Sequence, residues 1–342
     1  MPTSLIGALG FGRQSAKDTV ATSFQYIPAT SLGLNLNQSV QTLPPEVGGD
    51  YFLRGSYKAS VSGGGDCALV VRPNSVGALL YGQAGQDTVT GVTGQTGAYQ
   101  HVFQPFLPAA GVDLPWFTAV KDVVKLFAEQ YLNSKVAALS FSIPKSAIAT
   151  STVSLFTTTP SAISVPATET FDTSPPFQTC LGTVALTGEI SGIPISANSS
   201  VMENISIQFG NNLSQDEFAV GSFYAVGSTL LQRTVSVSMD FVIRDSALYQ
   251  AVYLNGGSIP NSWSPTILRG ALSATLTSGT NVPGTTQPYS LQFQFPGLDF
   301  NMIPITLSGA DLVRATLSTQ VTLGPSGSDR YTVTLINGIA SY

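Results

Sequence analysis

Charged side chains are scarce in this sequence of 342 residues, of which only 10% are Asp, Glu, Lys or Arg. A typical globular chain has about a quarter of its residues charged, and most of them lie on its surface. The 14 basic residues are outnumbered by 19 acidic ones, so the net charge is −5. Tight binding to a nucleic-acid backbone needs a basic patch, which this balance does not favour. We therefore expect partner proteins to cover much of the surface.

The side chains that usually carry metal-binding and catalytic chemistry are also rare. The single histidine, His101, falls on an expected strand, where a structural or surface role is far commoner than general base catalysis. Cys67 and Cys180 are far apart and have no second ligand at metal spacing, which argues against a disulfide framework or a zinc motif. We expect two free thiols, no metal, no cofactor and no enzymatic activity.

Long apolar runs are missing as well. No segment approaches the roughly 20 apolar residues that a membrane helix requires. The first residues, MPTSLIGALG, lack the basic start of a signal peptide. The sequence predicts a soluble, intracellular protein with no membrane partner.

Ser, Thr, Gly and Val are abundant, and 43% of the residues are hydrophobic. This composition favours sheets over helices. Apolar and polar residues alternate along TVSVSMDFVI at 234–243, with Val237, Met239 and Phe241 on one side and Ser236 and Ser238 on the other. We expect a mainly β fold whose sheets have one core face and one polar face.

One strand-to-helix junction is written twice. LVVRPNSVGALLYGQAG at 69–85 and FVIRDSALYQAVYLNGG at 241–257 match without a gap at Arg72/Arg244 and Gly85/Gly257. Further pairs follow in the same order: 23–27 with 206–210, 99–106 with 289–296, 137–143 with 315–321, and 152–155 with 332–335. A period this long indicates two tandem copies of one domain. We predict domains at 1–165 and 178–342, with a linker in the Ser/Thr/Pro-rich stretch 157–177.

Each copy is expected to be a β-sandwich or small barrel with one short helix packed on it. In the second copy the strand ends at Arg244, Asp245 is placed to cap the helix, and Gly256 or Gly257 ends it. Asn74 and Gly85 take the same places in the first copy. Only the first copy has a second helical pattern, over residues 113–135, with apolar residues at helical spacing: Phe117, Val120, Val124 and Phe127.

Three features resemble binding sites without completing one. SGGGD at 62–66 lacks the Lys-Ser/Thr of a phosphate-binding loop, so a strand bulge or turn is expected. Arg72 and Arg244 are interpreted as fixing the turn before each helix, the alternative being a salt bridge between subunits. Asp216 and Glu217 are interpreted as solvated loop charges, because hydrolysis would need a facing carboxylate pair.

The sequence resembles the tail tube protein, or major tail protein, of long-tailed bacteriophages with non-contractile tails. The resemblance rests on the strand running into a short helix over 53–85, the aromatic strand YQHVFQPF after it, and the segment from LPWFTAV to YLNSKVAALSFSI. The second-copy equivalents continue it through FPGLDFN and YTVTLING, so that it spans residues 20 to 340.

This resemblance implies a structural virion protein that self-assembles into stacked, trimeric and pseudo-hexameric rings around a conduit for DNA ejection. Long loops at 37–53 and 212–229 would contact the adjacent ring. The implied partners are further copies of the chain, the tape-measure, tail tip and terminator proteins, and transiently DNA, with assembly in the host cytoplasm and no cofactor. The implied contact residues are Gln41, Pro44, Glu46, Asp50, Asp216, Glu217 and Phe218, with Arg72 and Arg244 as structural or interface residues.

Two alternatives stay open at this point. Another β-sandwich capsid, fibre or surface-layer protein would share the Ser/Thr/Gly-rich strands but would not need two copies in matched order. A carbohydrate-binding module would be expected to expose a cluster of Trp or Tyr, whereas Trp116 and Trp263 lie in non-equivalent segments.

Overall fold

The computed structural model describes residues 7–45, 47, 55–107, 112–166, 168–188, 200–244, 246–254, 262, 265, 267–306, 312–322 and 330–342, and strands dominate them. The first half contains β1 (Ala8–Arg13), β2 (Gln25–Ile27), β3 (Ala29–Leu32), β4 (Asn35–Thr42), β5 (Ser56–Val70), α1 (Val76–Ala84), β6 (Gly85–Gly91), β7 (Tyr99–Pro105), β8 (Phe117–Val123), β9 (Phe127–Pro144) and β10 (Thr150–Ile163). The second half contains β11 (Gln178–Gly188), β12 (Ser200–Gly210), β13 (Thr234–Ile243), α2 (Ala247–Leu254), β14 (Leu268–Asn281), β15 (Pro288–Met302), β16 (Ile305–Thr306), β17 (Arg314–Val321) and β18 (Thr332–Asn337). The expected mainly β fold is confirmed.

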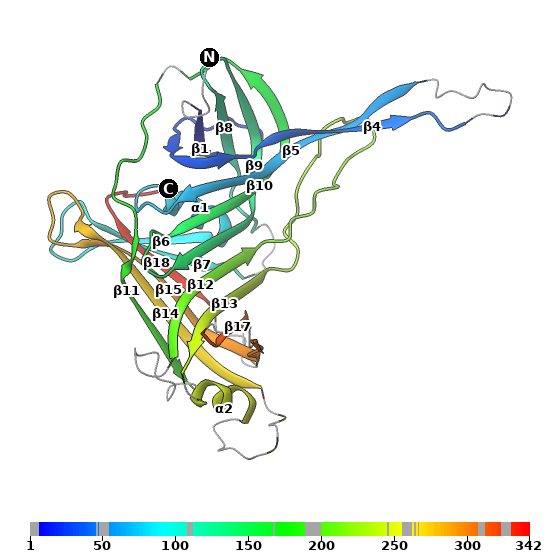
Figure 1. Cartoon of the computed structure of the whole chain (residues 1–342). Helices are drawn as coiled ribbons and strands as arrows, with labels where there is room; N and C mark the ends of the chain where they lie inside the picture. The colour runs from blue at the N-terminus through cyan, green and yellow to red at the C-terminus, as the bar shows by residue number, and fades with distance from the viewer. Residues whose placement is uncertain are drawn as a thin grey trace.

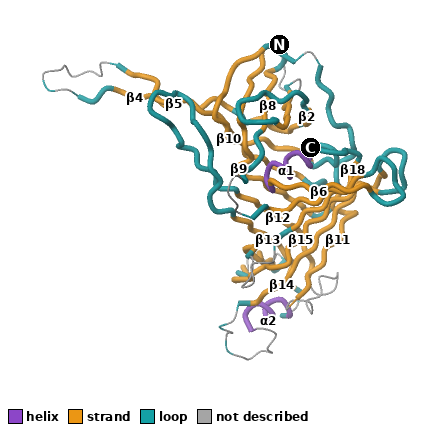
Figure 2. The backbone as a smooth tube through the Cα atoms, turned by 180° about the vertical axis from the view of Figure 1, so that it is seen from behind, coloured by secondary structure: helices purple, strands orange, loops and turns teal. Residues whose placement is uncertain are grey.

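The strands form two layers that face each other across one core (Figures 1 and 2). The first layer runs in the order β4–β5–β10–β9–β12–β13–β17, and every neighbouring pair in it is antiparallel. The second layer runs in the order β6–β7–β18–β15–β14–β11, again with antiparallel pairs. The long strand β15 belongs to both layers, because residues 290–294 pair with β18 while residues 298–302 pair with β17.

Aromatic side chains fill the space between the layers. The Phe141 ring of β9 lies 5.0 Å from the Phe293 ring of β15, and the Phe209 ring of β12 lies 6.1 Å from Phe295. All four are buried, and each contributes about 2–3 kcal/mol through the apolar area it removes from water. Because side chains alternate along a strand, this burial turns the intervening serines to the opposite face of the first layer.

Among the described residues, two strand pairings join the halves of the chain. Residues 138–144 of β9 pair with 204–210 of β12, and residues 99–103 of β7 pair with 333–337 of β18. Both halves contain the order strand, helix, strand, strand, as β5–α1–β6–β7 and β13–α2–β14–β15. The later strands differ in their neighbours, since β10 lies beside β5 whereas β18 lies between β15 and β7. The division into domains 1–165 and 178–342 stays a prediction.

The helix expected over residues 113–135 is wrong. These residues form β8 and the start of β9, joined by a tight turn in which the Leu126 N–H donates to the Val123 carbonyl at 3.0 Å. Strand β8 has a neighbour on each side, β1 and β9, and its residues Phe117 to Val120 are all buried. An internal strand buried on both faces shows no strict alternation, so its apolar residues matched a helical spacing by coincidence.

The expected linker begins too early. Residues 157–163 are the last part of β10, where Thr157 and Thr158 are buried and β-branched threonine favours a strand. The remaining residues, 164–177, cross to the second half and are anchored on the way. The Phe171 ring lies 6.2 Å from the Tyr26 ring, and Phe177 is fully buried.

The first strand-to-helix junction has the expected end but a different start. Gly85 follows α1 with φ 82°, a left-handed conformation that glycine adopts without strain. Ser75 stands at the cap position expected for Asn74, whose side-chain oxygen instead accepts a hydrogen bond from the Gly338 N–H. In the second junction, α2 ends at Leu254, and Asp245, Gly256 and Gly257 lie outside the described residues.

The glycines of SGGGD lie in a continuous part of β5, not in the bulge or turn expected. A Cβ atom at Gly65 would lie 2.1 Å from the Gly33 carbonyl oxygen, and one at Gly64 would lie 2.4 Å from the Leu155 carbonyl oxygen. The glycines are needed because neighbouring backbones approach β5 closely on both sides.

Candidate assembly surfaces

The outward face of the first layer carries hydroxyl and amide side chains in rows that cross five strands. We call it the polar face. Each residue in a row lies directly opposite the next one in the strand register. One row consists of Thr152, Ser140, Gln208, Ser236 and Gln320, and the next consists of Thr150, Ser142, Ser206, Ser238 and Ser318. The rows continue without interruption from the first half of the chain into the second.

The carboxylates on and beside the polar face are held by hydrogen bonds. Asp240 accepts from the Thr316 hydroxyl at 2.7 Å and from the Asn204 amide at 3.1 Å. At the end of the face, Glu203 accepts from Arg314 Nε at 3.1 Å and from the Lys145 ammonium. Hydrogen bonds from Lys145 and Arg314 hold the pKa of Glu203 below its usual range. The cations at this end of the face are therefore paired with a carboxylate.

A hairpin arm stands out from the body of the molecule (Figure 1). We call residues 35–62 the arm; it consists of β4, the first part of β5 and their connection. Every residue of β4 is exposed, including Gln41, and Pro44 is exposed just beyond it. Apolar side chains are among them, since Leu36 and Tyr57 are 51% and 61% exposed. Two expected contact residues of the arm, Glu46 and Asp50, lie outside the described residues.

A second segment, residues 211–233, connects β12 to β13 and passes over the first half of the chain (Figure 2). We call it the crossing loop. It begins at Asn211, whose buried amide donates to the Val136 carbonyl at 2.9 Å and the Gln83 carbonyl at 3.1 Å. Further along, the Phe223 carbonyl accepts from the Val61 N–H of the arm at 2.7 Å. The crossing loop therefore packs against the base of the arm.

A buried lysine holds the crossing loop in place. Lys135 of β9 is fully buried, and its ammonium donates to the Ser228 carbonyl and to the Asp113 carboxylate, both at 2.6 Å. The same ammonium lies 4.0 Å from the centroid of the Trp116 ring. Burial lowers the pKa of Lys135, and the Asp113 carboxylate opposes that shift. Each of these partners compensates part of the cost of removing the ammonium from water.

The acidic pair of the crossing loop has a local structural role. Asp216 accepts from the Ser214 hydroxyl at 3.0 Å, and Glu217 accepts from the Thr229 N–H at 2.6 Å. The hydrogen bonds from Thr229 hold the pKa of Glu217 below its usual range. Phe218 is 38% exposed and shares a shallow depression with Leu36 of the arm. Other apolar side chains of the loop are also exposed: Val220, Phe223, Tyr224 and Val226.

The two arginines of the repeated junction both lie between the end of a strand and the start of the next helix, Arg72 between β5 and α1 and Arg244 between β13 and α2. The Arg72 guanidinium donates to the Ser174 carbonyl and so ties the start of α1 to the segment that crosses between the halves. Arg244 is exposed.

His101 and Cys67 are buried structural residues. The two ring nitrogens of His101 contact the Asp87 carboxylate at 2.9 Å and the Ile339 carbonyl at 2.8 Å, so the ring links β6 and β7 to residues 339–342. Burial raises the pKa of the Cys67 thiol to about 11, and Cys180 is exposed. Both cysteines are free thiols, as expected.

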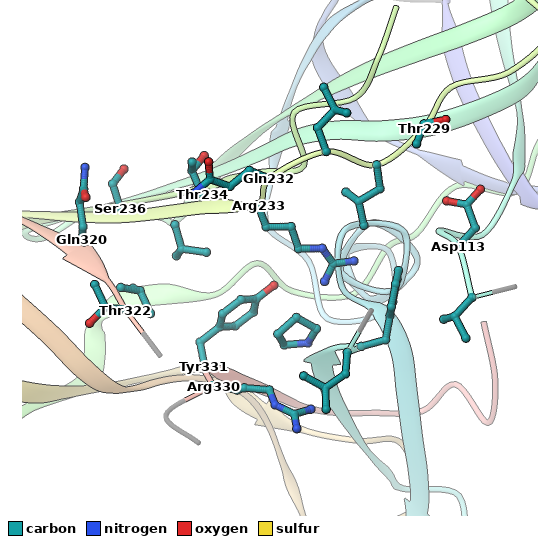
Figure 3. A pocket seen from close by; sticks show the side chains of 18 residues that line it. Asp113, Thr229, Gln232, Arg233, Thr234, Ser236, Gln320, Thr322, Arg330 and Tyr331 are labelled. Carbon is teal, nitrogen blue, oxygen red and sulfur yellow. The ribbon is translucent and has the colours of Figure 1, made fainter. Parts of the chain in front are cut away.

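A cavity of about 960 Å³ opens between the end of β7, the end of the crossing loop and the end of β17 (Figure 3). The Arg233 guanidinium reaches into it, 4.4 Å from the Phe106 ring centroid, and donates through Nη1 to the Ala84 carbonyl at 3.1 Å. Its Nε and Nη2 are out of contact with solvent and have no hydrogen-bond partner among the described residues. Arg330 also lines the cavity. Sequence reasoning missed this cavity because its walls come from three segments that are each more than 80 residues from the next.

Within the described part of the chain, no three His, Cys, Asp or Glu side chains gather as a metal site would require. None of the helices described is long and apolar enough to cross a membrane.

A family model described as phage tail tube protein matches residues 5–321 of the chain. The match extends from before β1 to the end of β17 and so includes the arm, the crossing loop and the polar face. No curated protein matches the sequence.

Proposed function

Because the chain belongs to the phage tail tube protein family, we propose that it is the major subunit of a phage tail tube. In this proposal copies assemble into rings, the rings stack, and the common lumen is the conduit for DNA ejection. The protein has no catalytic activity and needs no cofactor. The observation that carries the proposal is the polar face, which continues without interruption across both halves of the chain.

The polar face lines the lumen in this proposal. Its serines, threonines and glutamines bond to water and present no positive charge to a phosphate. Cationic side chains would hold DNA by releasing its counterions, whereas hydroxyl groups and carboxylates leave it hydrated and free to slide. The net charge of −5 has the sign that such a wall requires.

The strand count supports three copies in a ring. One chain contributes eight strands to the wall: the seven of the first layer and the C-terminal part of β15, which pairs with β17. With strands about 4.8 Å apart and tilted by about 40°, three copies close a barrel whose lumen is about 35–40 Å wide. Two copies would leave about 20–25 Å, which barely admits a DNA duplex about 20 Å across.

The pairing of β9 with β12 inside the chain is a template for the contact between copies. Strand β4 pairs only with β5, so its outer edge has no partner strand among the described residues. At the opposite end of the layer, β16 pairs with β17 and with no other strand among the described residues. An open edge is a ready template for another strand, and we place the ring contact at these two edges. The same edge-to-edge pairing of strands would join the two tandem copies, 1–165 and 178–342, around a pseudo-hexameric ring.

The arm and the crossing loop are the proposed contacts between stacked rings. Both expose apolar side chains in the single chain, among them Leu36, Tyr57 and Phe218. Exposed apolar surface of this kind marks a contact with another protein. The remaining contact residues that we propose are Gln41, Pro44, Asp216 and Glu217, together with Glu46 and Asp50, which lie outside the described residues.

The tube implies further partners. A tape-measure protein occupies the lumen before DNA does, a tail tip complex starts the stack and a terminator protein ends it. Assembly takes place in the host cytoplasm, and the product is part of the virion tail. Arg72 and Arg244 serve as structural residues of the two junctions.

Electron microscopy of the concentrated purified protein tests this proposal. We expect rings and tubes with threefold symmetry, and native mass spectrometry of dissociated rings should give three times the 35.7 kDa chain. A reconstruction should place Ser206 and Ser238 on the inner wall. Particles that stay monomeric at every concentration and temperature would contradict the tube, and rings of six chains would contradict the stoichiometry alone.

A further inference from the structure

The way in which the crossing loop packs on the first half of the chain is a model for how the cavity beside Arg233 is filled. The crossing loop, which connects β12 to β13, leaves its own half and covers the first half of the chain. It buries Leu213 and Ala225 against Leu114 and Phe156, and its Phe223 carbonyl accepts from the Val61 N–H of β5. A strand connection from one half therefore fills a groove on the neighbouring half.

The corresponding groove on the second half is the cavity. The ungapped match of 69–85 with 241–257 pairs β5 with β13, and extending it upstream places Val61 opposite Arg233. Arg233 lines the cavity, together with the start of β13 and the end of β17. In the same correspondence, the connection between β4 and β5 is the equivalent of the crossing loop. That connection belongs to the arm, whose described strands, β4 and the first part of β5, extend away from the body (Figure 1).

The chemistry of the cavity suits the arm. Its rim is apolar and exposed at Leu107 and Leu231, which are 53% and 59% exposed. Inside, two nitrogens of Arg233, Nε and Nη2, are out of contact with solvent and have no partner among the described residues, and buried guanidinium nitrogens need an acceptor. The sequence of the arm connection, LPPEVGGDYFL at 43–53, supplies apolar side chains and the two carboxylates of Glu46 and Asp50. Apolar surface and charge are complementary on the two sides.

We propose that this cavity is the seat for the arm of a second copy of the chain, the neighbour in the same ring. A carboxylate of the arm pairs with Arg233, and its apolar side chains pack on Leu231 and Phe106. The seated arm, like the crossing loop, still presents its outer side to the next ring. The inference rests on the proposed function, because it needs copies that adjoin in a ring.

A synthetic peptide of residues 38–58 tests the seat without requiring tubes. A fluorescent label on the peptide reports binding to dilute, monomeric protein through anisotropy. Arg233→Met, which keeps the apolar stem, and Leu231→Ser should each weaken binding by about tenfold. Leu181→Ser, at an exposed leucine of β11 outside the cavity, is the matched control and should bind as the unchanged protein does. A peptide with Gln and Asn at positions 46 and 50 should bind about tenfold more weakly and lose its sensitivity to Arg233→Met.

The outcomes separate this inference from the proposed function. Thermal melting identifies a variant that fails to fold. If Arg233→Met fails to fold, Leu231→Ser, on the exposed rim, gives an independent result. Peptide binding that depends on Arg233 and Leu231 supports the seat even if the protein never forms tubes. Normal tubes from both variants, together with no specific peptide binding, would overturn the seat and leave the tube proposal intact.

Discussion

At the scale of single residues, buried polar groups decide how the irregular segments lie. Lys135 fixes the crossing loop, and His101 fastens residues 339–342. Their partners are distant in the sequence, so no local sequence pattern predicts these contacts. Each partner compensates the loss of hydration, and removing it leaves a polar group without a bond.

Replacing Lys135 with Met should loosen the crossing loop. The Ser228 carbonyl loses its donor, and we expect the free energy of unfolding to fall by about 1–2 kcal/mol. Amide hydrogen exchange should rise across residues 223–229 while the strands keep their protection. Lys145→Met removes an exposed lysine elsewhere and should leave this exchange unchanged. Equal protection of the loop in the Lys135 variant and in the original protein would show that the ammonium is not its anchor.

The ion pairs of Glu203 should make stability depend on pH in the acid range. Lys145 and Arg314 lower its pKa in the folded state, so the folded chain holds this proton less tightly than the unfolded chain does. The resulting stability is present above the unfolded pKa, about 4.3, and is lost as pH falls through the lowered folded pKa. Urea titrations should show Glu203→Gln less stable than the original by about 1 kcal/mol or less at pH 7. The difference should vanish at low pH, and a constant difference across the range would rule out this titration as its cause.

At the scale of elements, sequence patterns predicted strands and junctions better than they predicted their neighbours. Alternation identified β13, and the junction pattern identified both helices and the glycine at position 85. The pattern failed at β8, because a strand buried on both faces carries apolar residues at any spacing. It also failed at 157–163, where threonines suggested a linker but pack in β10. Neither the crossing of residues 211–233 nor the cavity could be predicted, since both depend on which strands become neighbours.

The turn between β8 and β9 contains a correctable strain. Val124 and Lys125 have φ values of 50° and 63°, as in a type I′ turn, and a β-branched side chain is strained there. Val124→Asn should raise the free energy of unfolding by about 1 kcal/mol, because asparagine tolerates this conformation. Val123→Asn, one residue earlier in the strand, should lower it instead. Thermal or urea unfolding of the two variants provides the comparison, and a destabilised Val124→Asn would refute the strain.

At the scale of the whole molecule, the chain is a continuous sheet system with unusually incomplete surfaces. The first layer exposes an open edge at β4, and the arm leaves apolar residues in solvent. The cavity holds Arg233, whose Nε and Nη2 have no hydrogen-bond partner among the described residues. Composition pointed to partners, since a charge content of 10% is too low for a free surface. Composition does not locate the surfaces for those partners. The structure does, because the pairing of β9 with β12 continues the polar face across both halves.

Shortening the arm separates its role in assembly from any role in folding. Thr42 and Ser56 are directly paired, so replacing residues 43–55 with Asn-Gly closes the hairpin with a two-residue type I′ turn and keeps the register. No described residue of this segment lies in the core, and the melting transition should therefore change little. Tube formation should be lost, because the apolar and acidic contacts of the arm with other copies are gone. A Gly/Ser segment of unchanged length is the matched control for chain length. It should also fail to form tubes, since it restores the length of the connection but not its apolar and acidic side chains. Electron microscopy and sedimentation measure the outcome: tubes of normal length from the shortened chain would move the stacking contact to another surface, whereas tubes from the Gly/Ser variant alone would mean that the arm acts only as a spacer.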